Sequence, residues 1–226
     1  MALHELRIFR LTPGTTPQRL FQFFHCESGP CLKAALRDAG ISFVACWSTA
    51  GRNDEVVWIR GFENAEHKRT AVDRLYSSAL WKQHLEPQAD QLVASVEAID
   101  MTPVRFDELL TRRGRGFHEL RHYRLAPGTL PKMLDFFEDV RRVVPPYGVV
   151  VHAWWTAVVD GTDRFLWLRE FGDAVHKARV SKELYESSRW LTHFKPRTIG
   201  VIEERILKDL EPVPAELVGG YDDGPK

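Results

Sequence analysis

The chain opens the same way twice, and this repeat constrains the fold more than any other feature. HELRIFRLTPGTTP runs from His4 to Pro17, and HELRHYRLAPGTLP runs from His118 to Pro131. Later segments recur too: VVWIRGF returns as FLWLREF, and LYSSALWKQH returns as LYESSRWLTH. A repeat of about 110 residues is long enough to form a folded unit. We therefore expect two similar repeats, at 1–112 and 115–213, and a flexible tail at 214–226 that is rich in Gly, Asp and Pro.

Each repeat has the pattern strand, helix, strand, strand, helix, strand. This order is typical of the ferredoxin-like unit, an α+β fold with a four-stranded antiparallel sheet. In the first repeat we expect strands over 6–11, 41–49, 55–62 and just before Pro103, and helices from Pro17 toward Leu36 and from Asn64 to His84.

A ferredoxin-like sheet has helices on one face only, so its other apolar face must be buried by something else. Two fused copies satisfy this requirement when their sheets face each other, as in a dimeric α+β barrel. We expect this arrangement. The alternative is two independent units, each covered by another partner.

The repeated segments resemble the NIPSNAP family. The likeness rests on the His-Glu-Leu-Arg strand, the Pro-Gly turn, the Trp-bearing hairpin and the LYSSALWKQ and YESSRWLTHF segments, and it covers nearly the whole chain in two copies. It implies the dimeric α+β barrel superfamily, whose members carry out cofactor-free oxygenation, isomerisation and, in some branches, heme chemistry. The family has no settled general activity. Its animal members are associated with mitochondria, but this chain shows no presequence, so we expect a cytoplasmic protein.

Composition excludes several function classes. Lys+Arg and Asp+Glu number 31 each, so the net charge gives no reason to expect nucleic-acid binding, and no run of apolar residues predicts a membrane partner. The sequence has no GxGxxG, GxxxxGK, HExxH or GxSxG motif, and no Cys-His set at zinc-finger spacing. A nucleotide-dependent or classical hydrolytic enzyme is therefore disfavoured, and we predict no cofactor and no metal site. The three cysteines are expected to be reduced structural thiols.

Alternation along the strands selects the candidate binding residues. Val57 and Ile59 form an apolar face that we assign to the helix side, together with Leu6 and Ile8. The remaining side chains would then point toward the other sheet. Those expected to bind a ligand are Arg7, Trp58, Arg60, Arg121, Trp167 and Arg169. They could hold a carboxylate or enolate beneath a stacking indole, or could simply pair with Glu5 and Glu119 as a buried polar network.

Histidines supply the catalytic candidates. His67 and His176 begin equivalent helices and could act as general bases or heme ligands, or could be ordinary residues at a helix start. His152 and Trp154 occur only in the second repeat, and by alternation they share a face. If that face is the helix side, they line a pocket there, and we place Tyr185 in the same ligand-binding set.

The sequence therefore predicts a protein that binds a small apolar or aromatic molecule and that can also form a homo-oligomer. The alternative is a cofactor-independent monooxygenase or isomerase with a His base. Heme binding and a protein-interaction role are weaker alternatives.

Overall fold

The computed structural model describes residues 2–25, 31–107 and 116–213. The tail predicted at 214–226 lies outside the described residues, and so does Cys26. The described chain divides into two compact units. The first contains residues 2–25, 31–102 and 211–213, and the second contains residues 103–107 and 116–210.

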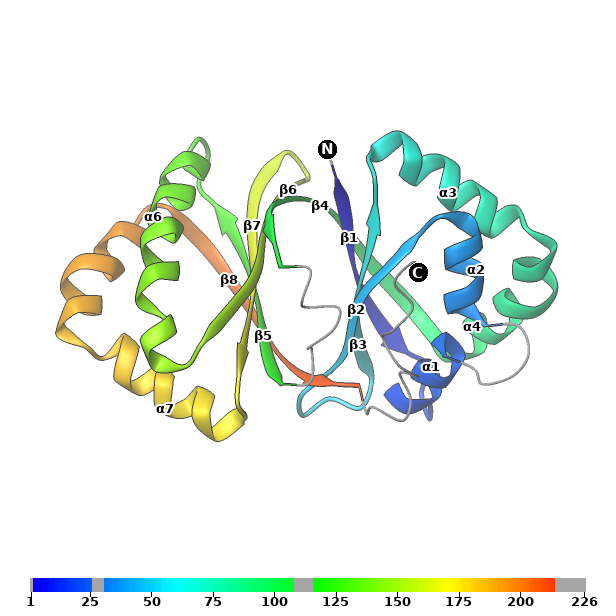
Figure 1. Cartoon of the computed structure of the whole chain (residues 1–226), viewed down its shortest axis with the longest axis horizontal. Helices are drawn as coiled ribbons and strands as arrows, with labels where there is room; N and C mark the ends of the chain where they lie inside the picture. The colour runs from blue at the N-terminus through cyan, green and yellow to red at the C-terminus, as the bar shows by residue number, and fades with distance from the viewer. Residues whose placement is uncertain (1, 26–30, 108–115, 214–226) are drawn as a thin grey trace. The chain divides into compact units, whose positions relative to one another are not determined.

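The first unit follows the predicted element order. Its strands are β1 (Leu3–Leu11), β2 (Ser42–Thr49), β3 (Glu55–Phe62) and β4 (Val93–Phe106). Its helices are α1 (Pro17–Phe24), α2 (Leu32–Ala39), α3 (Ala65–Ser77), a π-helical turn (Trp81–Leu85) and α4 (Glu86–Leu92). The strands pair antiparallel in the order β4-β1-β3-β2, which is the ferredoxin-like order. The helices lie on one side of this sheet (Figure 1).

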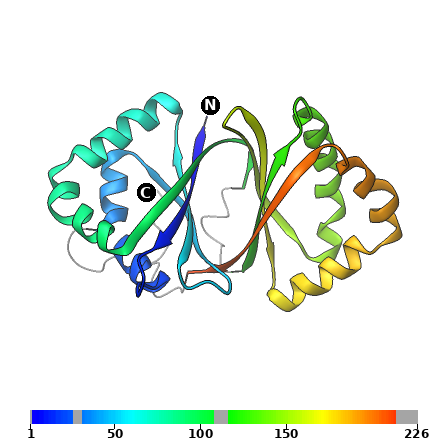
Figure 2. The ribbon, with the colours of Figure 1, turned by 180° about the vertical axis from the view of Figure 1, so that it is seen from behind.

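The second unit repeats the same plan. Its strands are β5 (Phe117–Leu125), β6 (Val150–Val159), β7 (Thr162–Phe171) and β8 (Ile202–Pro212). Its helices are α6 (Leu130–Val143), α7 (Ala174–Tyr185), a π-helical turn (Trp190–Phe194) and short 3-10 turns at Pro145–Tyr147 and Lys195–Thr198. The antiparallel order is β8-β5-β7-β6, and Figure 2 shows the helices on one side of this sheet from behind.

Local sequence explains where the first helices begin and end. Thr16 is the N-cap of α1 and Pro17 follows at the first helical position, where its missing N–H costs nothing. The prediction of one continuous helix toward Leu36 is wrong, because α1 ends at Phe24 and α2 begins at Leu32. Residues 26–30 between them lie outside the described part of the chain.

A serine interrupts the second long helix of each unit. Ser78 Oγ donates to the Leu75 carbonyl oxygen at 2.7 Å and accepts from the Trp81 N–H at 3.1 Å. It thereby ends α3 and caps the next turn, so the helix predicted to run to His84 is divided. Ser187 makes the same two hydrogen bonds and places Trp190 at the start of the second π-helical turn.

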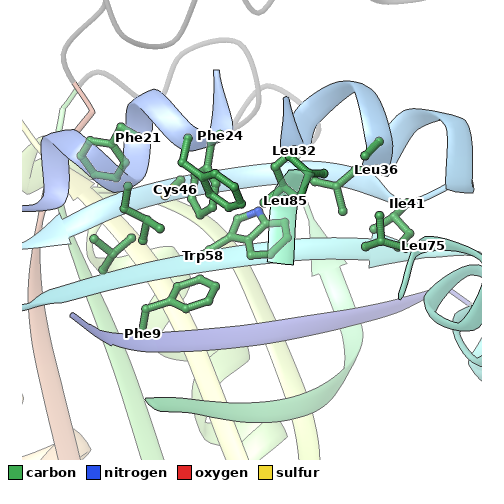
Figure 3. Packing of buried hydrophobic residues seen from close by; sticks show 14 of the residues in the cluster. Phe9, Phe21, Phe24, Leu32, Leu36, Ile41, Cys46, Trp58, Leu75 and Leu85 are labelled. Atoms are coloured by element: carbon green, nitrogen blue, oxygen red, sulfur yellow. The ribbon is translucent and has the colours of Figure 1, made fainter. Parts of the chain in front are cut away.

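The core of each unit lies between the sheet and its helices. Figure 3 shows Phe9 and Trp58 on the side of the sheet where α1 and α2 lie, among Phe24, Leu36 and other apolar side chains. Trp58 packs on Phe24 with 5.3 Å between ring centroids. In the second unit Phe137 of α6 takes this central place, 4.9 Å from Trp167 and 5.2 Å from Trp154. The predicted α+β class with two ferredoxin-like repeats is confirmed.

Among the described residues, no helix is both long and apolar enough to cross a membrane.

Candidate functional site

A buried glutamate organises the polar side chains of each sheet. In the first unit Glu5 of β1 accepts a hydrogen bond from Arg60 Nε of β3 at 2.9 Å, lies 2.8 Å from Arg60 Nη2, and pairs with Arg7 at 3.2 Å. Lys68 of α3 closes the cluster by pairing with both Glu5 and the more exposed Asp100. Register explains the geometry, because Glu5 lies directly opposite Arg60 in the antiparallel pair.

The second unit contains the equivalent cluster. Arg169 donates to Glu119 Oε1 at 2.9 and 3.1 Å, and Lys177 of α7 lies 2.7 Å from the other carboxylate oxygen. Arg121 also pairs with Glu119, and Lys177 also pairs with Asp209. Burial alone would raise the pKa of Glu119, but the charges of Arg121 and Arg169 and hydrogen bonds from Arg121 and Lys177 lower it to about 2.

These clusters lie on the helix side of each sheet, so the face predicted from the sequence is wrong. Trp58 contacts Phe24 of α1, and Glu5 pairs with Lys68 of α3. Val57 and Ile59 therefore occupy the opposite face. The misassignment arose because all eight residues of β3 are buried, so apolar alternation could not distinguish its two faces. The same correction applies to the other predicted strand residues, which are Arg7, Arg60, Arg121, Trp167 and Arg169.

A cavity opens between sheet and helices beside each cluster. The first has a volume of about 290 Å³ and the second about 330 Å³. Equivalent side chains line the two: Arg7, Phe9, Phe24, Trp58, Tyr76 and Trp81 in the first, and Arg121, Tyr123, Phe137, Trp167, Tyr185 and Trp190 in the second. The structure therefore brings together most of the predicted binding residues and adds the two tryptophans of the π-helical turns.

The charged lining differs between the two cavities. Arg7, Arg60 and Asp90 line the first cavity. Arg121, Lys195 and Arg205 line the second, and no acidic side chain stands among its described lining residues. The second cavity is therefore the more attractive of the two to anions, because Asp90 has no counterpart there and because Lys195 and Arg205 form no ion pair with a described residue.

Several buried donors at the clusters lack a hydrogen-bond partner among the residues that the structure describes. They are Arg7 Nε, Arg60 Nη1, Trp58 Nε1, Trp167 Nε1 and Arg169 Nη1. A buried donor without a partner costs free energy, commonly about 1–3 kcal/mol. An acceptor entering the cavity would recover part of that cost.

Aromatic rings hold the guanidinium groups at the second cavity. Arg121 Cζ lies 5.3 Å from the ring centroids of both Trp167 and Tyr185, and Arg169 Cζ lies 5.0 Å from that of Trp167. Such cation–π contacts fix the position of a cation without neutralising its charge. A planar ligand could stack here while its anionic group meets the arginines.

His67 and His176 take part in the hydrogen bonding at the starts of α3 and α7. His67 Nδ1 accepts from the Glu63 N–H at 3.2 Å, and His176 Nδ1 accepts from the Gly172 N–H at 3.0 Å. His176 Nε2 also lies 2.8 Å from the Tyr147 carbonyl oxygen. Both ring nitrogens of His176 are thus engaged by backbone groups. This geometry favours the helix-start interpretation over a general base or an axial heme ligand.

A β-bulge separates His152 from Trp154. The β6–β7 register shifts between Val151 and Ala153, so strict alternation fails at His152. Trp154 faces the helices, where it packs against Phe137. Tyr185 lines the second cavity. His152 points to the opposite face, because its Nε2 lies 2.6 Å from Oε2 of Glu170, which directly follows the helix-facing Arg169 on β7. The shared face predicted for His152 and Trp154 is therefore wrong.

The structure instead groups His152 with His118 and Glu170, which the sequence did not indicate. Their potential ligand atoms lie within 4.8 Å of one another. Metal-ligand motifs in a sequence join residues that are close along the chain. These three residues lie on the separate strands β5, β6 and β7, so no such motif indicated them. Burial lowers the pKa of His118 to about 4, although the charge of Glu170 opposes this.

Comparisons with known proteins identify the fold. No family model and no curated protein matches the chain. An "anthrone oxidase-like protein" is similar in structure, with a TM-score of 0.60 and 10% identity over 94% of this chain and 92% of that one. A "putative monooxygenase" from Lactobacillus acidophilus has a TM-score of 0.55 and 8% identity, and the match covers 92% of each chain.

A third similar structure carries the family name that the sequence suggested. It is an uncharacterised NIPSNAP-like domain protein from Burkholderia xenovorans, with 20% identity and a TM-score of 0.41 over 47% of this chain and 88% of its own. The two matches with TM-scores above 0.5 show that this chain shares the fold of those two proteins, in agreement with the predicted fold class.

Proposed function

We propose that this protein binds a small aromatic or apolar molecule that carries a carboxylate or a similar anionic group. The observation that carries this proposal is the second cavity, where aromatic walls adjoin three cationic side chains and no described acidic one. Its volume of about 330 Å³ is at the small end of the usual range for ligand sites. The first cavity would bind the same class of molecule more weakly, because Asp90 lies in its wall.

Each part of the lining has a distinct role in this proposal. The ring of the ligand would stack on Trp167 or Trp190, and its anionic group would meet Arg121. Lys195 and Arg205 would add attraction from the rim, since both are exposed and neither forms an ion pair with a described residue. Glu119 would hold Arg121 and Arg169 in place.

A pair of matched ligands tests the proposal. Binding of 2-naphthoate and of its neutral analogue 2-naphthamide would be followed by quenching of tryptophan fluorescence. We expect the acid to bind at least tenfold more tightly, because only the acid carries the charge. Equal affinities, or no binding of the acid by the folded protein, would refute the proposed anion preference.

Rim variants locate the bound acid. The double variant Lys195→Gln/Arg205→Gln removes two exposed charges, each contributing up to about 1 kcal/mol. It should weaken 2-naphthoate binding several-fold and leave 2-naphthamide unchanged. Arg179→Gln is the control, since Arg179 is an exposed α7 side chain that pairs with Glu183 away from the cavity.

The alternative function is a cofactor-independent monooxygenase or isomerase. Its support is the fold shared with proteins named as a monooxygenase and as anthrone oxidase-like. The predicted histidine base is absent from the described residues that line the two cavities, which favours binding. Oxygen uptake, or a changed ligand recovered after incubation with the protein, would favour the enzyme instead.

A further inference from the structure

Three neighbouring strands of the second unit bring two histidines and a glutamate together. His118 of β5 lies opposite Glu170 of β7 in the antiparallel register. His152 is the bulged residue of β6, next to the same part of β7. All three therefore lie at one end of a rigid sheet, which is a more precise support for a site than a loop.

The donor atoms converge. His152 Nε2 lies 2.6 Å from Glu170 Oε2, and His118 Nε2 lies 3.8 Å from the same oxygen. The two imidazole rings are 5.5 Å apart between centroids. A small movement of the Glu170 side chain would make room for one ion between these three donor atoms. The two imidazole nitrogens and the carboxylate oxygen could then bind the ion at bond lengths of about 2.1 Å.

Surrounding groups orient these donors. His118 Nδ1 lies 2.7 Å from the Gly116 carbonyl oxygen, which can only accept, so the lone pair of that ring is on Nε2 and faces Glu170. His152 Nδ1 lies 3.7 Å from Asp107 Oδ2, and the Asp107 N–H donates to the His152 carbonyl oxygen. The ring of His118 is thus held by a backbone carbonyl, which is a usual support of a metal-binding histidine, whereas Asp107 is near His152 without a hydrogen bond to its ring.

Gly116 provides room for the glutamate. A Cβ atom at this position would lie 2.1 Å from Glu170 Oε1, so a side chain here would displace the carboxylate. His118 and His152 are 0% and 3% exposed, whereas the Glu170 side chain is 22% exposed. The cluster is thus buried on its histidine side and reachable from solvent on its carboxylate side.

The first unit shows that the fold does not require this cluster. There His4 lies opposite Gly61 instead of a glutamate, and the bulge between Phe43 and Ala45 contains Val44 instead of a histidine. The strands, their register and the bulge are present in both units, but the carboxylate and the second imidazole occur only in the second. The cluster is therefore an addition to a sheet that forms without it.

We propose that His118, His152 and Glu170 form a binding site for a divalent transition-metal ion such as Zn²⁺ or Fe²⁺. Two imidazoles and one carboxylate leave coordination positions open and suit such ions better than Mg²⁺ or Ca²⁺, which prefer oxygen donors. Glu170 exchanges its direct contact with His152 for a bond to the ion. The site is separate from the two sheet–helix cavities, whose described linings contain none of these three residues.

Metal titration of the chelator-treated full chain tests this proposal. Binding of Zn²⁺ would be measured by calorimetry, and Co²⁺ would report coordination through its visible absorption. Glu170→Gly and His152→Val each introduce the residue that the same strand position carries in the first unit. His193→Ala is the control, since His193 is exposed and lies outside the cluster.

We expect the chain to bind one Zn²⁺ and to show the Co²⁺ absorption, while Mg²⁺ gives no signal. Each of the two cluster variants should lower Zn²⁺ affinity at least tenfold and abolish the Co²⁺ absorption, whereas His193→Ala should bind as the unchanged protein does. Far-ultraviolet circular dichroism would verify that each variant is folded. The proposal is overturned if the unchanged protein binds no Zn²⁺, or if folded Glu170→Gly or His152→Val binds it equally well.

Discussion

Replacing Glu119 by Gln should destabilise the protein strongly at neutral pH. The change keeps the size of the side chain but removes the negative charge that Arg121, Arg169 and Lys177 share. Glu119 and Arg169 are both 0% exposed, so water cannot replace the lost partner. Breaking a buried ion pair by removing one member typically costs about 3–5 kcal/mol.

The pKa of Glu119 gives a second measure of the same interaction. Its value of about 2, compared with the ordinary glutamate value of 4.5, corresponds to about 3 kcal/mol at about 1.4 kcal/mol per tenfold change in proton affinity. Because the pKa is lower in the folded state, this stabilisation is fully present above pH 4.5. It is lost as the pH falls from 4.5 through about 2.

Urea unfolding followed by tryptophan fluorescence would measure the effect. At pH 7 we expect Glu119→Gln to lower the free energy of unfolding by about 3–5 kcal/mol, and the difference from the unchanged protein should narrow below pH 4.5. Glu183→Gln is the control, since Glu183 is an exposed partner of Arg179 on α7 and should change stability by less than about 0.5 kcal/mol. A loss below 1 kcal/mol for Glu119→Gln would refute the reasoning.

Three further predictions concern individual side chains. Asp173→Ala removes the N-cap of α7, which accepts from the His176 N–H at 2.7 Å, and should cost about 1 kcal/mol in thermal or urea unfolding. Burial raises the pKa of the Cys46 thiol, so iodoacetamide at pH 8 should label the partly exposed Cys31 much faster, and comparable rates in the folded protein would contradict this. Burial lowers the pKa of His4 to about 4, so the free energy of unfolding should fall as the pH drops from 6.5 to 4. In urea unfolding, His4→Gln should reduce that fall by up to about 3 kcal/mol. If His4→Gln left the pH profile unchanged, the lowered pKa of His4 would be refuted.

The repeat allowed most of the fold to be predicted from the sequence. Strand alternation and turn residues indicated the β-α-β-β-α-β order of both units, and Pro17 indicated the start of α1. The division of the second helix was missed because it depends on side-chain hydrogen bonds of Ser78 and Ser187, which apolar periodicity does not reveal.

The candidate site could be predicted in part. The residue types were found, since Arg121, Trp167 and Tyr185 do line one cavity. The face of the sheet to which these side chains point was not predicted correctly. A strand that is buried on both faces, such as β3, shows no alternation of apolar and polar residues that would distinguish the two faces. The grouping of His118, His152 and Glu170 depends on strand register and on a bulge, neither of which local sequence patterns reveal.

Native mass spectrometry of the purified protein, before and after denaturation, tests the central claim most directly. The account predicts that the folded chain carries or takes up small aromatic acids, at most one in each sheet–helix cavity, and releases them on denaturation. The Lys195→Gln/Arg205→Gln variant should retain less of them than Arg179→Gln does. Recovery of a neutral or cationic ligand, or a folded chain that takes up no added 2-naphthoate, would contradict the account.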